Sequence, residues 1–176
     1  MPVGRMSRVA AAVVAALSLV CALGVPASAA PRSDAPSVQV LLAQINSVRV
    51  SHGLAPLRLS PALSRAAAVH STEMARNGYF GHESANGSSF DKRIARFYAS
   101  RGWQYWSVGE NLVAGCPDID VDTAIQTWLD SPPHRETLLA ARFREIGLSA
   151  VHVPSAAGVY DGDSVTIITA DFGVRR

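Results

Sequence analysis

His82, Glu110 and His134 are the residues of this sequence whose side chains could form a chemical site. His82 follows a Tyr-Phe-Gly run, Glu110 is the middle residue of Gly-Glu-Asn, and His134 follows Ser-Pro-Pro. Two imidazoles and one carboxylate can bind a divalent cation such as zinc, or exchange protons with a bound water. We therefore predict that the fold brings these three residues into one cleft.

Each of the three residues also has a plainer interpretation. His82 could be an exposed loop residue, and His134 could be a surface histidine in the first turn of a helix. A buried Glu110 needs a partner, because an unpaired buried carboxylate is costly, and it could accept backbone N–H groups that fix its own loop. The helix dipole disfavours a protonated imidazole near a helix N-terminus, so we expect His134 to be neutral at pH 7.

Other candidate groups give weaker signals. His70 and Glu73 have helical spacing, which can supply two metal ligands, but one histidine on an apolar helix face is usually a packed core residue. Asp118, Asp120 and Asp122 alternate as in the first half of a calcium loop, but the positions that such a loop reserves for glycine and glutamate hold threonine and leucine. We interpret these aspartates as the acidic start of a helix.

The first 29 residues have the features of a secretory signal peptide. Two arginines precede an apolar run, and a Pro-Ala-Ser-Ala sequence ends at Ala29, where small residues suit cleavage. We predict that residues 1–29 are removed, that residues 30–37 form a flexible leader and that one domain spans residues 38–176. A retained anchor is the alternative, but the run is short for a spanning helix. We expect a secreted, extracellular monomer without a permanent membrane span.

Removal of the signal peptide changes the charge balance. The full chain has 16 basic and 14 acidic residues. The predicted signal contains Arg5 and Arg8 and no acidic residue, so 14 of each remain and the mature chain has no net charge. Nucleic acid and acidic membranes then lose their main electrostatic attraction, and we expect no nucleic-acid partner. Cys116 is the one cysteine left, so an internal disulfide is excluded and a half-buried structural thiol is expected.

Apolar spacing predicts helices in the first part of the chain and strands in the last. The clearest boundaries belong to the second helix, which begins with Ser60 as cap and Pro61 at the first helical position, and ends at Gly78. Helices first and strands last favour an α+β fold with mainly antiparallel strands. The expected helices begin at residues 38, 61, 90, 121 and 132, with the third ending at residue 100 and the last at about residue 141. The expected extended segments cover residues 103–113, 146–153 and 164–172.

Several short motifs occur in an order that is informative. Residues 74–82 read Met-Ala-Arg-Asn-Gly-Tyr-Phe-Gly-His, residues 109–112 read Gly-Glu-Asn-Leu, and residues 128–135 read Trp-Leu-Asp-Ser-Pro-Pro-His-Arg. Shorter matches lie at residues 41–49, 57–63, 143–147 and 171–173. This ordered set resembles the CAP superfamily (cysteine-rich secretory, antigen 5 and pathogenesis-related-1 proteins, also called SCP-like), in its bacterial secreted branch.

The resemblance implies a CAP-type α-β-α sandwich with a large open cleft. In the family two histidines and two glutamates line that cleft, and the histidine pair can hold a divalent metal, often zinc. Carried over, His82 and His134 are the histidine pair and Glu110 is the first glutamate. Ser131 stands where the second glutamate is expected, so the set is incomplete. We add Asn111 and Ser131 to these three residues as candidate binding residues.

Two functions from different classes fit these residues. The first is a secreted binding module whose cleft takes a lipid, a cell-wall glycan or a peptide, with an optional Zn²⁺ or other divalent cation. The second is a zinc-dependent extracellular hydrolase, in which His82 and His134 bind the metal and Glu110 activates water. One carboxylate cannot be both ligand and base, so binding is favoured over catalysis. A wall-associated structural protein with an inactive cleft is a third hypothesis.

Overall fold

The structure is a computed structural model that describes residues 19–21 and 35–176. The predicted signal peptide, apart from Leu19–Cys21, and residues 30–34 of the predicted leader lie outside the described residues. Residues 35–37 have no regular structure and lead directly into the first helix.

The helices begin where local capping signals stand. Pro61 follows the extended residue Ser60, and Gly78 ends the second helix with a left-handed φ of 65°. The side chain of Asp120 accepts a 2.8 Å hydrogen bond from the N–H of Thr123, which confirms an acidic helix start there. The helices are α1 (Val38–Ser51), α2 (Pro61–Asn77), α3 (Phe90–Ala95), α4 (Val121–Asp130), α5 (Pro132–Leu138) and the 3₁₀ turn η1 (Gly158–Tyr160).

The strands form one five-stranded sheet in the order β1-β3-β5-β4-β2. Its three long strands are antiparallel: β3 (Trp106–Cys116), β4 (Glu145–Val153) and β5 (Val165–Arg175). The two short edge strands, β1 (Leu19–Cys21) and β2 (Arg58–Leu59), pair in parallel with β3 and β4. β1 lies inside the predicted signal peptide, so the sequence did not predict it as part of the fold. Its backbone pairs with the end of β3, at Ala114–Cys116, where the sheet edge has backbone groups to satisfy.

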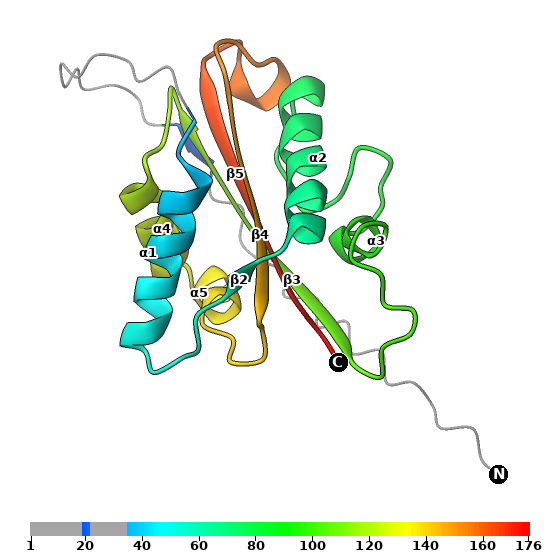
Figure 1. The fold of residues 1–176 in the computed structure, drawn as a ribbon. Coiled ribbons are helices and arrows are strands. Elements are labelled where there is room, and N and C mark those ends of the chain that lie inside the picture. The colour runs from blue at the N-terminus through cyan, green and yellow to red at the C-terminus, as the bar shows by residue number, and fades with distance from the viewer. Residues whose placement is uncertain (1–18, 22–34) are drawn as a thin grey trace.

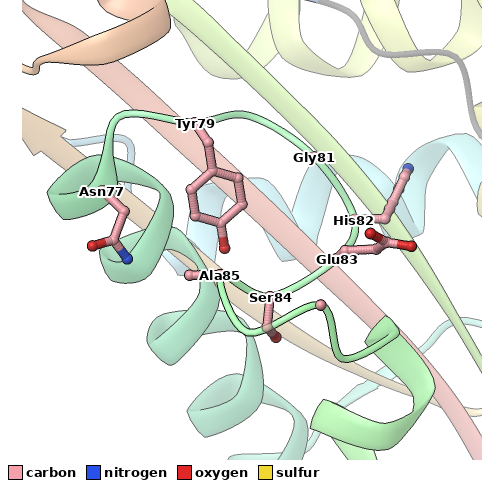
Figure 2. A pocket seen from close by; sticks show the side chains of 8 residues that line it. Asn77, Tyr79, Gly81, His82, Glu83, Ser84 and Ala85 are labelled. Carbon is pink, nitrogen blue, oxygen red and sulfur yellow. The ribbon is translucent and has the colours of Figure 1, made fainter.

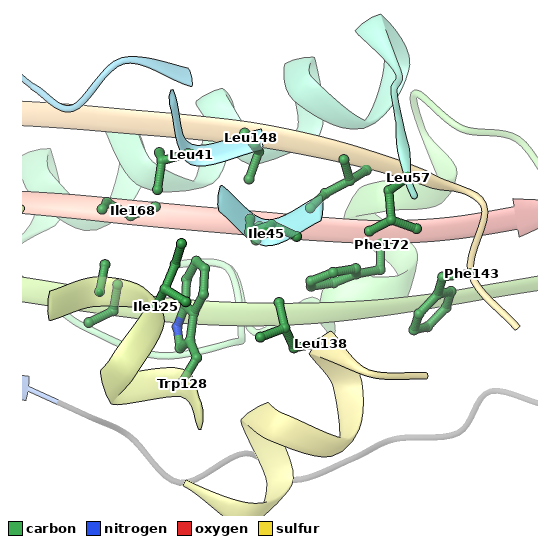
Figure 3. Close-up of a cluster of buried hydrophobic side chains, with 14 of the residues drawn as sticks. Leu41, Ile45, Leu57, Ile125, Trp128, Leu138, Phe143, Leu148, Ile168 and Phe172 are labelled. Carbon is green, nitrogen blue, oxygen red and sulfur yellow. The ribbon is translucent and has the colours of Figure 1, made fainter. Parts of the chain in front are cut away.

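Helices cover both faces of the sheet, as Figure 1 shows, with α1, α4 and α5 on one face and α2 and α3 on the other. The first face holds the larger apolar core, which Figure 3 shows packed around Trp128, Phe143 and Phe172. Two smaller apolar clusters pack under α2 and α3. The arrangement is the α-β-α sandwich expected from the motifs.

Two helices are shorter than predicted. α3 ends at Ala95 rather than near residue 100, and α5 ends at Leu138 rather than near residue 141. After α3 the chain turns so that Tyr98 is fully buried and its hydroxyl donates a 2.5 Å hydrogen bond to Glu145. A longer α3 would carry Tyr98 away from that contact. Among the described residues, no helix has the length and apolar character needed to cross a membrane.

Candidate functional site

Glu110 is the centre of a buried polar cluster on the α2–α3 face of the sheet. It lies in the middle of β3, and its side chain is 0% exposed. One carboxylate oxygen, Oε1, is 2.8 Å from Nδ1 of His82, and the other, Oε2, forms an ion pair with Nη2 of Arg93. Both oxygens of the carboxylate are therefore occupied by side chains of the protein.

Arg93 ties the loop after α2 to this carboxylate. It is only 3% exposed and projects from α3. Besides Glu110, its Nη1 donates 3.0 Å hydrogen bonds to the carbonyl of His82 and to the hydroxyl of Ser84. One guanidinium thus connects a strand, a helix and a loop, which holds His82 in a fixed position.

The contact with Glu110 decides which ring nitrogen of His82 can meet a ligand. A carboxylate only accepts hydrogen bonds, so Nδ1 of His82 must be the protonated nitrogen in that 2.8 Å contact. In the neutral ring, Nε2 then carries the lone pair. The side chain is 18% exposed, so His82 is the member of this cluster that reaches solvent.

Charge and burial act in opposite directions on Glu110. Burial by itself raises the pKa of a carboxyl group. The hydrogen bond from His82 and the charge of Arg93 outweigh burial here, and the pKa of Glu110 is lowered. Glu110 is therefore an anion near neutral pH.

Asp171 is a second carboxyl group beside Glu110. The two residues are directly opposite one another in the β3–β5 register, and Asp171 is 0% exposed. Neither oxygen of Asp171 accepts a hydrogen bond from another described residue. Burial and the neighbouring Glu110 raise the pKa of Asp171 well above its ordinary value. The pKa of Glu110 is lowered and that of Asp171 is raised, so Glu110 releases its proton first and Asp171 second as the pH rises.

His70 packs beneath the same cluster. It is 0% exposed, its Nε2 donates to the carbonyl of Gly81 at 2.8 Å, and the same nitrogen lies 4.0 Å from Glu110. Its Nδ1 lies 3.7 Å from Glu73, which also accepts a 2.9 Å hydrogen bond from the Tyr79 hydroxyl. Burial is the main cause of a lowered pKa for His70. This is a packed, hydrogen-bonded histidine, the interpretation favoured from the sequence.

His134 lies in α5 on the other face of the sheet. It is the third residue of that helix, as predicted, and is 1% exposed. Burial, and then the charge of the nearby His82, lower the pKa of His134 to about 4. The ring is neutral at pH 7, and its Nδ1 is buried without a hydrogen-bond partner among the described residues. The expected neutrality thus has desolvation as its main cause.

Asn111 and Ser131 lie around His134. The side-chain amide of Asn111 donates a 2.9 Å hydrogen bond to the backbone carbonyl of His134, which joins β3 to α5. Ser131 precedes α5 as its N-cap residue and is half-buried, without a side-chain capping bond. The structure brings His82 and Glu110 into direct contact and places His134 close enough to interact with the charge of His82.

A groove of about 640 Å³ opens beside His82. In Figure 2 the loop after α2 bends around Tyr79, and His82 lies further along the same loop. Small and polar residues line the groove, although most of the surface that they expose in it is apolar, and Glu110 and His134 are not among them. Its lining residues are Asn77, Tyr79, Gly81, His82, Glu83, Ser84, Ala85 and Gly87.

Sequence reasoning did not identify Arg93 or Asp171 as members of the cluster. A signal for Asp171 exists, because it is a lone acidic residue within the apolar run Val165–Val174. A signal for Arg93 is weaker, since it is adjacent to the core residue Ile94 and one turn of helix cannot show which side chain points inward.

Few side chains at this site are available to coordinate a metal ion. Residues 19–21 and 35–176 contain no group of three His, Cys, Asp or Glu side chains placed to hold a metal ion. Stable protein zinc sites use three or four protein ligands. A cation held by His82 and His134 would have only two imidazoles, so water or a bound ligand would have to complete its coordination.

The comparisons with known proteins agree with this architecture. The model of the cysteine-rich secretory protein family, CAP, matches residues 42–170. The chain belongs to this family, and the resemblance drawn from the motifs is confirmed.

Individual relatives are bacterial. The chain is 30% identical over 125 residues to YkwD of Bacillus subtilis, a match that covers 70% of this chain and 46% of YkwD. A crystal structure of an extracellular SCP-domain protein from Bacillus anthracis superposes with a TM-score of 0.58 at 30% identity, over 78% of this chain and 40% of that protein. This chain spans less than half the length of both.

A third protein shares the fold. An outer surface protein of Borrelia burgdorferi superposes with a TM-score of 0.63 at 22% identity, over 78% of this chain and 92% of that protein. The two solved proteins are thus described as an extracellular protein and an outer surface protein.

Proposed function

We propose that this protein is a secreted binding module whose groove beside His82 takes a polar cell-wall glycan or peptide. One observation carries the proposal: both oxygens of Glu110 are occupied, one by His82 and one by Arg93. Glu110 therefore orients His82, and Nε2 of His82 is the group presented to a ligand. The outer-surface and extracellular descriptions of the relatives support secretion.

The walls of the groove favour a polar ligand. Asn77, Glu83 and Ser84 offer hydrogen-bonding groups, and Tyr79 offers an aromatic ring. Ligand sites fix orientation with a few such polar groups and use aromatic rings for contact area. A glycan or a peptide presents polar groups together with apolar ring or side-chain faces, so it matches this mixed lining better than an acyl chain, which has no polar group for these residues.

A divalent cation is an optional part of this proposal. A metal bound here would be held by His82 and His134 and would supply Lewis-acid contact to an anionic ligand group. The carboxylate behind His82 is the kind of outer partner that orients a metal-binding imidazole. With only two imidazoles, we expect weak binding that a ligand strengthens.

The hydrolase alternative receives less support from the geometry. A general base must come within hydrogen-bond reach of the water proton that it takes. The side chain of Glu110 is 0% exposed and both of its oxygens already bind side chains, so solvent water would reach it only after a rearrangement, and Asp171 is fully buried too. We therefore retain binding as the function and treat turnover as the result that would overturn it.

The test is titration calorimetry of the secreted protein with soluble peptidoglycan fragments and short peptides, with and without Zn²⁺. We expect binding that weakens about fivefold or more in His82→Ala, since a well-placed polar contact is worth about 1 kcal/mol or more. His52→Ala is the matched control, because His52 is exposed at the end of α1. Cleavage of a fragment, or equal affinity in His82→Ala, would contradict the proposal.

A further inference from the structure

The sheet gathers arginines at one of its ends. The end of β5 lies opposite the start of β3, with Arg175 paired in register with Trp106. Glu145, the first residue of β4, is in register with Gly173 of β5 and with Arg58 of β2. This brings Arg58, Arg144, Arg175 and Arg176 together, although they come from three separate parts of the sequence.

Aromatic rings lie among these arginines. The guanidinium of Arg175 lies 4.1 Å from the ring centre of Tyr98 and 5.1 Å from that of Trp103. Arg176 lies 4.9 Å from the ring centre of Tyr105. Trp103 is 41% exposed, so a large apolar ring reaches solvent beside stacked cations.

We call this surface the basic end and define it by residues 56–59, 98–106, 143–146 and 173–176. It contains five arginines, since the loop before β3 adds the exposed Arg101. Within these described segments Glu145 is the one acidic residue, and its carboxylate accepts the hydrogen bond from Tyr98. The positive charge of the basic end is therefore largely unneutralised.

The other end of the sheet has the opposite charge. Residues 117–122 and 161–164 contain five aspartates and no basic residue. Ser164 donates a 3.2 Å hydrogen bond to the carbonyl of Pro117, which holds the two segments side by side. The eleven residues of β5 separate the ends by roughly 35 Å. Figure 1 shows the C-terminus at one end of the sheet and η1 at the other.

We propose that the basic end docks onto an anionic phospholipid surface. Arginine guanidinium groups bind phosphate oxygens in a bidentate manner. An amphipathic aromatic ring such as Trp103 settles at the level of the headgroups, between water and acyl chains. The aspartates at the far end would be repelled if they faced the same surface, which disfavours the reverse orientation, so we expect the basic end to face the membrane.

A second copy of this chain is the competing partner, because its acidic end is complementary in charge. The aromatic rings of the basic end argue against a second copy as the partner. The acidic segments 117–122 and 161–164 contain no aromatic residue, so a head-to-tail contact would press Trp103 against aspartates. A headgroup layer accommodates both the cations and the ring.

This surface is separate from the groove beside His82, and the proposal does not depend on what that groove binds. The groove is lined by residues 77–87, none of which belongs to the basic end. The two functions can therefore fail or succeed independently.

The experiment is co-sedimentation of the secreted protein with vesicles of phosphatidylcholine mixed with phosphatidylglycerol, compared with phosphatidylcholine alone. We expect binding to the mixed vesicles only, and weaker binding as salt is added. Each arginine near an anionic surface is worth about 1 kcal/mol, so the double variant R101Q/R176Q should bind about 30-fold more weakly. R65Q/R76Q removes two exposed arginines of α2 and is the matched control.

Tryptophan fluorescence gives a second measurement, which reports on the ring of Trp103. Trp103 is exposed, Trp106 is half-buried with its ring N–H bonded to the carbonyl of Tyr98, and Trp128 is fully buried, so most of a vesicle-induced blue shift of fluorescence should disappear in Trp103→Phe. Equal binding to neutral vesicles, or no difference between the two double variants, would overturn the proposal. So would concentration-dependent oligomers without vesicles that R101Q/R176Q abolishes, which would assign the surface to a second copy. Binding to soluble polyphosphate as tight as to vesicles, without a blue shift, would assign it to an anionic polymer.

Discussion

The two faces of the sheet bury different kinds of side chains. The face under α1, α4 and α5 is filled by apolar side chains such as Trp128 and Phe143. The face under α2 and α3 buries Glu110, Asp171 and Arg93 among smaller apolar clusters. The first face is held by contact area, and the second depends on a single arginine that compensates a buried charge. Removing one residue should therefore have different consequences on the two faces.

The largest effect is expected from Arg93→Met. This change leaves the Glu110 carboxylate buried without its cation, which typically costs about 3–5 kcal/mol. Chemical denaturation at pH 7 would measure the loss, and adding Glu110→Gln should recover part of it. Arg96→Met is the control, because Arg96 is exposed at the end of the same helix and should change stability by less than about 0.5 kcal/mol. A similar cost for both variants would show that the buried ion pair is not what supports this face.

Gly147→Ala should rank next. A methyl group on Gly147 would overlap the backbone of Leu63 and Ser64, so α2 would have to move away from β4. We expect a loss of about 3 kcal/mol, at the upper end for overpacking. On the apolar face, a methyl on Gly109 meets only the side chains of Phe143 and Thr137, at 3.0 Å or more. Gly109→Ala should therefore cost less, and thermal unfolding of both variants tests the order; the reverse order would contradict the close approach of α2.

The smallest and most specific effect is expected on the pH dependence of the free energy of unfolding. The folded-state pKa of Asp171 is raised, so its contribution to stability is complete below its unfolded pKa and is lost as pH rises through the folded pKa. The slope is at most about 1.4 kcal/mol per pH unit. His134 acts in the opposite direction, because its pKa is lowered to about 4 and it loses stability as the pH falls from 6.5 toward that value.

Asp171→Asn separates these contributions. The variant keeps a hydrogen-bond donor opposite Glu110 but cannot lose a proton. Subtracting the two denaturation curves removes the histidines, and the stability of the variant relative to the wild type should increase as the pH rises above about 4. A difference that does not change with pH would mean that Asp171 titrates normally and that the two carboxyl groups do not interact.

Many of the helix and strand boundaries can be predicted from short stretches of the sequence. Ser60-Pro61 and Gly78 mark the ends of α2, Asp120 caps α4, and the β-branched run after Ser164 becomes β5. These features depend on backbone dihedral preferences and capping bonds over a few residues. They can therefore be predicted from the sequence without knowledge of the tertiary structure. The ordered motifs also identified the family, since a set of short matches over one chain is more specific than any one of them.

The composition of the buried cluster was decided by the tertiary structure. Asp171 becomes a neighbour of Glu110 only because β5 pairs with β3 in one register, and shifting that register by one residue would turn Asp171 to the other face. Arg93 reaches Glu110 only because α3 stops after six residues and packs beside β3. The sequence by itself thus determined the elements and the histidines, while strand pairing and helix packing decided which charges meet. Those charges interact strongly because burial removes the water that would screen them.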